Sequence, residues 1–463
     1  MSPIAKLRLI PFLILIGLLS SAGTTSAANT VLHSFAGAPN DGRNPSGLTL
    51  VNNVLYGTAA FGGPNNGQGV VFRMNTDGTG YTILHTFLGG SNDGARPGGK
   101  LIVSGSKIYG VTQNGGTNNF GTLYSMDLSG ANFVVLHSFA GGVNDGAFPG
   151  LSFVLLNGTL YGSAELGGPD NLGVLFKVNT DGSGFTILHG FITGPTDGHL
   201  PIGGLTLAGS TLYGTTAQGG TTSNGGTLFK IEPNGTGYTI LHSFGAAGDG
   251  FNPEKELTPV GNTLFGVTNQ GGTAGTGTIF KINTAGTGYS VIYSFESTAG
   301  NGGSPSSPLF PLGNRLIGST DPLHAPIPGL VYSIRDDGSD FVVLYRFNGS
   351  NTEGREPGGS FSAMGPNLFG MAQFGGTSGV NGGVIYSLLL PLNITAVNYS
   401  PGGSFSLTGQ TFSNCPLTIQ IFSNLQDDPA ESHQISSDSA GNFQFGDMDA
   451  ASEPNRFYRA VVP

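Results

Sequence analysis

The sequence predicts an all-β fold, with a seven-bladed β-propeller closed by its N-terminal strand and a small C-terminal β-sandwich. Two observations support this prediction. A unit of about 52 residues recurs seven times, and each unit contains four short segments that read as strands. Units of roughly 40–50 residues with four strands each are typical of propeller blades, whereas the coils of a parallel β-helix, the competing fold, are shorter.

Three recurring anchors place all seven units in the same register. A Gly follows a Leu-Tyr pair or its equivalent at Gly57, Gly110, Gly162, Gly214, Gly266, Gly318 and Gly370. A loop of the form acid-Gly-x-x-Pro begins at Asp41, Asp93, Asp145, Asp197 and Asp249, then at Asn301 and Glu353. A Leu-His-x-Phe segment carries His33, His85, His137, His189 and His242, then Tyr293 and Tyr345 in place of His.

The fourth unit shows the strands most clearly. Its apolar, β-branched runs are bounded by Gly, Asn and Pro, which is the sequence signature of short strands. The expected strands are Leu205–Leu207, Thr211–Thr216, Thr227–Ile231 and Tyr238–Phe244. The first unit starts with a last strand, near Val31–Phe35, and the seventh stops at a third strand, near Gly383–Ser387. We therefore expect the N-terminal strand to complete the seventh blade and so to remove an exposed sheet edge.

Three segments are predicted along the chain. Residues 1–28 read as a secretory signal, because Lys6 and Arg8 precede the apolar run Leu9–Leu19 and small residues follow up to Ala28. Residues 29–390 form the propeller. In residues 391–463 the period is lost, and a β-sandwich-like module is expected. Its predicted strands are Gly403–Leu407, Leu417–Phe422, Ser432–Ser436, Asn442–Phe445 and Arg456–Val461.

Composition limits the function classes. The formal net charge is −10 and charged residues make up only 10% of the chain, so a basic groove for nucleic acid is not expected. No apolar stretch after the signal is long enough to be a transmembrane segment. The single Cys415 excludes an intrachain disulfide framework. These features predict an exported chain, extracellular or associated with the cell surface.

The combination Leu-His-Ser-Phe, Asp-Gly-x-x-Pro, Leu-Tyr-Gly-Thr, Gly-Gly and Gly-Thr-Leu-Phe resembles the GloVer tandem repeat of secreted bacterial proteins. The resemblance covers about 360 residues and all seven units. The tail, with Ala440–Phe445 and Arg456–Arg459, looks like a β-module appended to such proteins. The resemblance implies a fold and a location, and it implies no defined activity.

Strand alternation predicts that the longer connections of every unit emerge on one common face, where function is expected. The histidines, one on the outermost strand of each of five blades, are candidates for a metal site. They are spread around the circumference and Tyr replaces two of them, so packing and a hydrogen bond are the expected role. The repeated aspartates are candidate calcium ligands, although one carboxylate per loop is few for an ion that takes six to eight oxygens. An Asx-type turn is the alternative for Asp41, Asp93, Asp145, Asp197 and Asp249. No other cofactor is expected.

The sixth unit departs from the pattern. Its loop places Asp321 three residues before His324, a pair that is a candidate general base or half a metal site; loop drift is the alternative. Glu165 and Asp170 are candidate acids on the same face. The aromatic side chains of Phe61, Phe120 and Phe374 are candidates for stacking on a ligand.

Three functions follow as hypotheses. The first is an extracellular binding or scaffold module for a polymer, glycan or protein partner. The second is a lyase or hydrolase with a site on the loop-rich face, which a cluster of Asp321, His324, Glu165 and Asp170 would favour. The third is a structural component of the cell envelope or matrix.

Overall fold

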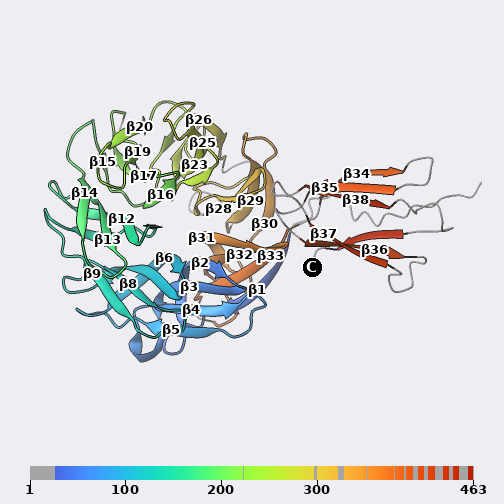
Figure 1. Cartoon of the computed structure of the whole chain (residues 1–463), viewed down its shortest axis with the longest axis horizontal. Helices are drawn as coiled ribbons and strands as arrows, with labels where there is room; N and C mark the ends of the chain where they lie inside the picture. The colour runs from blue at the N-terminus through green and yellow to red at the C-terminus, as the bar shows by residue number, and fades with distance from the viewer. Residues whose placement is uncertain are drawn as a thin grey trace, which may run out of the picture. The chain divides into compact units, whose positions relative to one another are not determined.

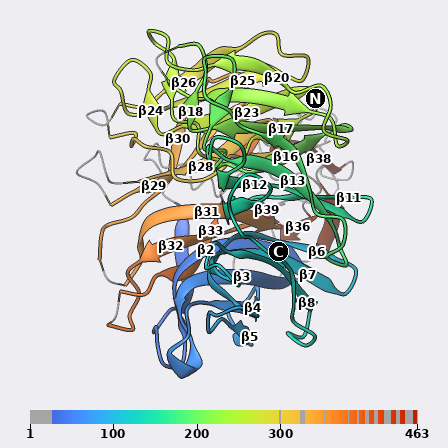
Figure 2. The same cartoon turned by 90° about the vertical axis from the view of Figure 1, so that its left-hand side faces the viewer.

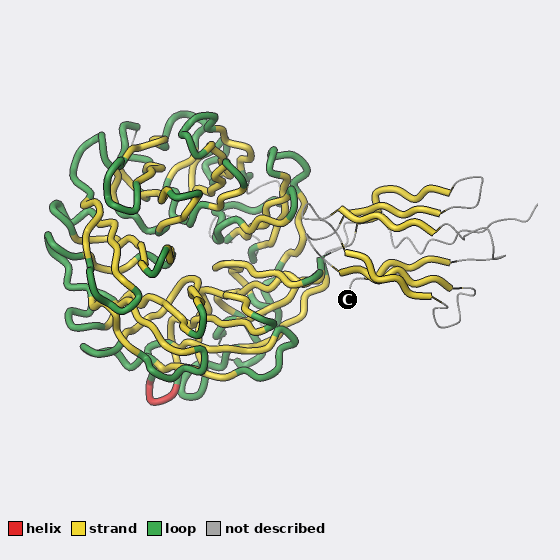
Figure 3. Tube along the Cα trace, in the orientation of Figure 1, coloured by secondary structure: helices red, strands yellow, loops and turns green. Residues whose placement is uncertain are grey.

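A computed structural model gives the fold of the chain (Figure 1). It describes residues 27–222, 224–296, 300–321, 328–350, 352–379 and 381–390, and six strands of the C-terminal part. Seven small antiparallel sheets are arranged in a circle, which confirms the seven-bladed propeller. Strands and loops make up nearly all of the described chain, with one short 3-10 helix at Pro64–Asn66 (Figure 3).

Each blade contains four main strands, which in the first six blades follow one another in chain order from the ring axis to the circumference. The first two blades comprise β2 (Gly42–Val51), β3 (Val54–Gly62), β4 (Val70–Asn75) and β5 (Thr82–Thr86), then β6 (Gly94–Ser104), β7 (Lys107–Gly115), β8 (Thr122–Asp127) and β9 (Val134–Ser138). The next two comprise β10 (Gly146–Pro149), β11 (Val154–Leu156), β12 (Thr159–Gly167), β13 (Val174–Asn179) and β14 (Thr186–Gly190), then β15 (Gly198–His199), β16 (Leu205–Ala208), β17 (Thr211–Thr216), β18 (Gln218–Gly219), β19 (Thr227–Ile231) and β20 (Thr239–Ser243).

The last three blades repeat the plan. They comprise β21 (Gly250–Phe251), β22 (Thr258–Val260), β23 (Thr263–Thr268), β24 (Gln270–Gly271), β25 (Thr278–Asn283) and β26 (Ser290–Ser294); then β27 (Phe310–Leu312), β28 (Arg315–Thr320), β29 (Leu330–Arg335) and β30 (Val342–Arg346); then β31 (Arg355–Met364), β32 (Asn367–Phe374), β33 (Val384–Leu389) and β1 (Ala28–Ser34). In the fourth blade the four main strands match their predicted bounds to within one residue.

The ring closes as predicted, because β1 pairs antiparallel with β33 and becomes the outer strand of the seventh blade. The inner strands also form a closed circle. Thr49 Oγ1 donates to the Leu101 carbonyl of the next blade at 2.7 Å, and Ser360 Oγ donates to the Leu48 carbonyl at 3.1 Å, joining the last blade to the first. Figure 2 shows the strands of the seventh blade beside those of the first.

The recurring Gly of the second strand is needed because an aromatic ring from the third strand packs on it. A Cβ atom on Gly57 would lie 2.4 Å from the Phe72 ring, and one on Gly162 would lie 2.7 Å from the Phe176 ring. These aromatic side chains are fully buried, as is Phe35, the Phe of the first Leu-His-x-Phe segment. Each blade core is therefore built from two recurring aromatic residues and one recurring Gly.

The C-terminal part forms a separate unit of two three-stranded antiparallel sheets. One sheet contains β34 (Asn393–Tyr399), β35 (Phe405–Gln410) and β38 (Asn442–Asp447); the other contains β37 (Glu431–Ser436), β36 (Pro416–Phe422) and β39 (Phe457–Val461). The ring of His433 lies 5.4 Å from that of Phe445, a contact between the two sheets. Five of the six strands were predicted, and β34 was missed because it continues directly from the last blade.

Closure of the ring can be tested with a disulfide. Thr30 faces Ser387 in the β1–β33 register, and paired residues in antiparallel strands have Cβ atoms about 4.5–5.5 Å apart. In a Cys415→Ser background, we expect Thr30→Cys/Ser387→Cys to form a disulfide on oxidation and to stabilise the fold by about 2–4 kcal/mol, measured by denaturation. The two single Cys variants are the controls. Failure of the pair to cross-link would contradict the closure.

Candidate functional site

The connections between strands define two faces of the ring. The loop face carries the connections from the second to the third strand and those between blades, and the turn face carries the tight turns. The acid-Gly-x-x-Pro loops and the Gly-Gly loops meet on the loop face, as predicted. For example, the Gly63 amide donates to the Asp41 carbonyl at 2.7 Å and the Gly220 amide donates to the Asp197 carbonyl at 2.8 Å.

One backbone feature recurs in all seven loops of the loop face. The residue before each loop proline is not Gly, yet its φ is positive, between 48° and 58°. This left-handed conformation is uncommon for such residues, and it clusters at functional sites in proteins. The seven pre-proline residues are Asn44, Arg96, Phe148, Leu200, Asn252, Ser304 and Glu356.

The left-handed conformation directs the amide of each pre-proline residue across the seam to the preceding blade. The Arg96 amide donates to the Gln68 carbonyl at 2.8 Å, and the Phe148 amide donates to the Phe120 carbonyl at 2.8 Å. The Asn44 amide donates to the Gly382 carbonyl at 2.7 Å, which makes the same bond across the closing seam. The backbone is thus the same at all seven positions, while the side chains differ in size, polarity and charge.

A second recurring contact joins the blades near the circumference. The His33 Nε2 atom lies 3.0 Å from Asp41 Oδ2, and the His33 ring stacks on Tyr81 of the next blade, with the centroids 3.8 Å apart. The Tyr81 hydroxyl donates to Asp41 Oδ1 at 2.6 Å, and the Ala36 and Gly42 amides also donate to this carboxylate. Four further aspartates pair with a histidine in the same way, and the pairs are His85–Asp93, His137–Asp145, His189–Asp197 and His242–Asp249.

These contacts shift the ionisation of the aspartates. Burial alone would raise the pKa of Asp41, but the hydrogen bonds from His33 and Tyr81 outweigh it and lower the pKa. The pKa values of Asp197 and Asp249 are lowered in the same way. The calcium hypothesis remains a prediction, and an ion at Asp41 would have to displace protein donors from both carboxylate oxygens. Within the described ranges, no group of three or more His, Cys, Asp or Glu side chains is placed to hold a metal.

A cluster of charged and polar side chains lies at the loop-face ends of the inner strands, and we call it the inner-strand cluster: Glu165, Glu254, Lys255, Asn269 and Asp321. Asn269 Nδ2 donates to Glu254 Oε2 at 2.5 Å. Burial and the charge of Glu254 raise the pKa of Glu165. Burial lowers the pKa of Lys255, while the charges of Glu254 and Asp321 oppose that shift.

The cluster has unsatisfied hydrogen-bond acceptors. The Oδ1 atom of Asn269 is buried, and so is that of the neighbouring pre-proline residue Asn252; neither has a hydrogen-bond partner within the described part of the chain. A buried acceptor without a donor costs about 1–3 kcal/mol, which a donor from water or a ligand would recover. The inner-strand cluster therefore suits a ligand that carries hydroxyl or amino groups.

The structure brings together only part of the predicted acid set. Glu165 and Asp321 both belong to the inner-strand cluster, at the same register of the third and sixth blades. Asp170 lies apart on an exposed loop, where its Oδ2 accepts hydrogen bonds from the backbone and side chain of Thr193. His324 lies outside the described residues, so the predicted Asp321–His324 pair stays a prediction.

The three predicted aromatic residues lie in two settings. Phe120 packs edge-on against Phe148, with the centroids 5.5 Å apart, at the seam between the second and third blades. Phe61 and Phe374, in contrast, lie close to arginine guanidinium groups. Stacking of these rings on a ligand remains a hypothesis.

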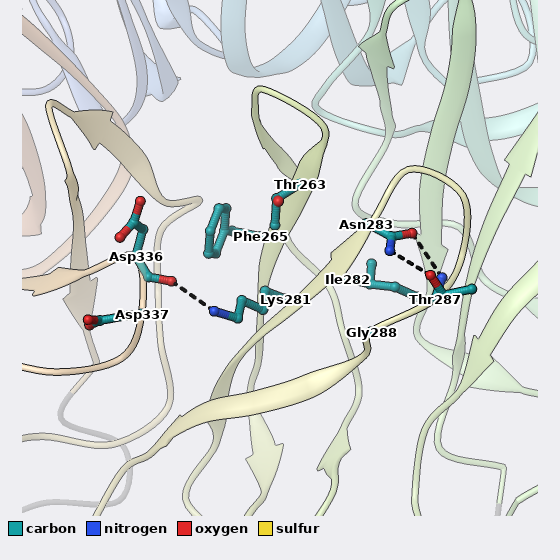
Figure 4. A pocket seen from close by; sticks show the side chains of 9 residues that line it. All are labelled: Thr263, Phe265, Lys281, Ile282, Asn283, Thr287, Gly288, Asp336 and Asp337. Atoms are coloured by element: carbon teal, nitrogen blue, oxygen red, sulfur yellow. Dashed lines mark hydrogen bonds between the residues drawn. The ribbon is translucent and has the colours of Figure 1, made fainter. Parts of the chain in front are cut away.

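The turn face carries a pocket of about 260 Å³ between the fifth and sixth blades (Figure 4). In the preceding seam, the Tyr213 hydroxyl donates to the Thr284 carbonyl of the next blade at 3.0 Å. Phe265 occupies the register of Tyr213 and has no hydroxyl, so Lys281 Nζ reaches the Asp336 carbonyl instead, at 3.4 Å. The pocket is lined by Lys281, Asp336 and Asp337 among other residues, and it contains no convergent set of catalytic groups.

Sequence reasoning missed Glu254, Lys255 and the pre-proline residues. The signal was present, because alignment of the seven units shows Glu-Lys-Glu at 254–256 where the other units carry mostly Gly and Ser. Three consecutive charged residues, at positions where no other unit has more than one, mark this blade as different from the others.

The fold and the loop face define a β-propeller whose seven equivalent loops present different side chains from one shared backbone. The Gloeobacter/Verrucomicrobia repeat matches residues 17–225 and 208–411. The chain therefore belongs to the Gloeobacter/Verrucomicrobia repeat family, which confirms the resemblance found in the sequence. No curated protein matches the chain.

Solved structures with a similar fold have low sequence identity. An oligogalacturonate lyase in complex with manganese is 14% identical, with a TM-score of 0.50, over 79% of this chain and 98% of the lyase. PorZ, a surface component of the type-IX secretion system of Porphyromonas gingivalis, is 12% identical, with a TM-score of 0.48, over 92% of this chain and 58% of PorZ. The GH74 enzyme of Niastella koreensis is 13% identical, with a TM-score of 0.46, over 93% of this chain and 68% of the enzyme. The similarity to the lyase shows the fold alone.

The aspartate contacts predict a loss of stability in acid. The ordinary pKa of the carboxyl group is 3.8, and the folded values of Asp41, Asp197 and Asp249 lie below it. The unfolded chain therefore takes up protons first, so the stabilisation is present above about pH 4 and is lost as the pH falls through the folded values. We expect the melting temperature to drop over this range.

A triple variant Asp41→Asn/Asp197→Asn/Asp249→Asn should be less stable at pH 7, by about 1–3 kcal/mol per site, and its stability should depend less on pH. The control Asp77→Asn/Asp181→Asn/Asp337→Asn changes three exposed turn residues and should retain near-wild-type stability at pH 7. Equal stability of the two triple variants would contradict this role.

Proposed function

We propose that this chain is an exported binding module that recognises an extracellular ligand with the loop face of its propeller. The main support is the set of seven pre-proline residues, which share one backbone conformation and one seam hydrogen bond but include amide, cationic, aromatic, aliphatic, hydroxyl and acidic side chains. Side chains that vary on a rigid, repeated scaffold are the usual arrangement of a recognition surface. Such a surface can match a ligand that contacts several blades at once.

The chemistry of the inner-strand cluster favours a hydroxylated ligand. The unpartnered acceptors of Asn252 and Asn269 are suited to hydroxyl donors. Gln113 and Gln373 are exposed at the register of Glu165 in other blades, and they add amide groups that both donate and accept. A carbohydrate polymer supplies many hydroxyl groups in a row, so it is the ligand class that this face fits best.

Export is part of the proposal. The basic residues Lys6 and Arg8 and the apolar run Leu9–Leu19 support it, and they precede β1, which must remain for the ring to close. Among the described residues, the structure contains no helix with the length and apolar character of a membrane span. A family named for bacterial repeats agrees with a bacterial extracellular setting.

The binding function can be tested with paired amide variants. We expect the full chain to bind members of a panel of immobilised neutral and acidic polysaccharides in biolayer interferometry. Gln113→Ala/Gln373→Ala, on the loop face, should weaken binding at least about tenfold, the effect of losing about 1.4 kcal/mol. Asn262→Ala/Asn314→Ala, on the turn face, should leave it unchanged. If no member of the panel binds, this proposal is contradicted, and the hypothesis of a structural component of the cell envelope or matrix is favoured instead.

A second candidate function, cleavage of the bound polymer by a hydrolase or lyase reaction, is favoured by one observation. Burial and the neighbouring Glu254 raise the pKa of Glu165, and a carboxyl group with a raised pKa is suited to serve as a general acid. If the chain cleaves a polysaccharide that it binds, Glu165→Gln should abolish the release of new chain ends without loss of binding. Asp170→Asn is the matched control and should retain activity. Binding without release of chain ends by the wild type would exclude this candidate.

A further inference from the structure

Three arginines on neighbouring blades of the loop face make no ion pair, although the charge of Arg355 acts on the adjacent Glu356. Arg43, Arg96 and Arg355 belong to the first, second and seventh blades. In the described part of the chain, no carboxylate lies within ion-pair distance of any of them, although the chain has 27 acidic residues and a net charge of −10. Near the turn face, in contrast, Arg315 pairs with Asp340 at 2.6 Å.

The backbone fixes where the arginine side chains lie. Arg43 is the direct cross-strand partner of Phe61, and its Cζ atom lies 5.5 Å from the centroid of the Phe61 ring. Arg96 reaches the same ring from the next blade, at 5.2 Å. It is a pre-proline residue, so its position is held by the left-handed conformation and the bond to the Gln68 carbonyl. Arg355 lies 5.7 Å from the Phe374 ring.

Two positive charges on one ring repel each other. Since both contacts share Phe61, the charges lie at most about 11 Å apart, close to the Debye length of about 10 Å at 0.1 M salt, so screening does not remove the repulsion. The Nε atom of Arg355 is buried and, within the described residues, has no hydrogen-bond partner. A bound anion would relieve the repulsion and supply an acceptor for this donor.

We infer that Arg43, Arg96 and Arg355, with Phe61 and Phe374, form a site for the carboxylate-bearing sugars of an acidic polysaccharide; this inference rests on the proposed binding function. The planar guanidinium fork matches a carboxylate in two parallel hydrogen bonds, and the rings offer apolar surface for a sugar face.

The rest of the loop face restricts the ligand further. Glu165, Glu254 and Asp321 lie in the remaining blades and repel a continuous polyanion such as a nucleic acid. A polysaccharide in which uronate residues alternate with neutral hydroxylated sugars places its charge on the arginines and its hydroxyl groups on the amides. The charge pattern of the face therefore favours spaced carboxylates.

The test uses two double variants that remove the same charge. Arg43→Gln/Arg96→Gln changes the site, and Arg73→Gln/Lys177→Gln changes two cations at equivalent positions of third strands, near the turn face. The probes are a soluble polyuronate, the same polymer after reduction of its carboxyl groups, and a sulfated dextran. We expect the wild type to bind the polyuronate best and to lose at least tenfold in affinity between 50 and 300 mM salt.

Arg43→Gln/Arg96→Gln should reduce polyuronate affinity at least tenfold, and Arg73→Gln/Lys177→Gln should not. Arg43 and Arg96 are both exposed, so the melting temperature of this variant should stay unchanged, which would show that it folds. Equal binding by the two variants, equal binding of the reduced polymer, or preference for the sulfated dextran would overturn the inference. If the reduced polymer binds and only Gln113→Ala/Gln373→Ala abolishes it, the binding function stands and the carboxylate site fails. If no probe binds, the proposed binding function and the carboxylate site are both contradicted.

Discussion

The hydrogen bond from each pre-proline amide to the preceding blade is the contact on which the ring depends. Seven blades with different side chains must pack against one another at nearly the same angle, and only a contact made by the backbone is independent of the side chain. The proline restricts the backbone after each contact, and the left-handed conformation of the residue before it orients the amide toward the carbonyl of the preceding blade. The cost of that conformation, of order 1–3 kcal/mol per residue, is offset by the seam it allows.

The same constraint separates structure from recognition. Near the circumference, imidazole, carboxylate and aromatic ring bind one another across the seam, so these polar groups stabilise the ring and are largely committed to it. At the pre-proline positions the seam contact is made by the backbone amide, so side chains such as Arg96 and Glu356 are free to differ between blades. The recurring polar residues thus hold the fold, while the residues that vary between units carry the candidate site.

This division explains what the sequence predicts well and what it does not. Periodic features, such as the Gly that accommodates an aromatic ring or the N-terminal strand that completes the last blade, repeat often enough to be read without coordinates. The site consists of departures from the repeat; a departure such as Glu-Lys-Glu at 254–256 is visible when the seven units are aligned, but its role cannot be inferred from the period. The pairing of Arg96 with Phe61 joins two blades, and sequence distance gives no sign that these residues meet.

Hydrogen exchange at the seams tests the central claim most directly. The Asn44 amide crosses the closing seam to the Gly382 carbonyl, whereas Arg96, Phe148 and Leu200 make the same bond between blades that are consecutive in the chain. Mass spectrometry with residue-level fragmentation can compare their exchange rates in the native protein. A closed ring with seven equivalent seams predicts that the Asn44 amide exchanges as slowly as the other three. Fast exchange at Asn44, with slow exchange at the others, would show that the ring is open.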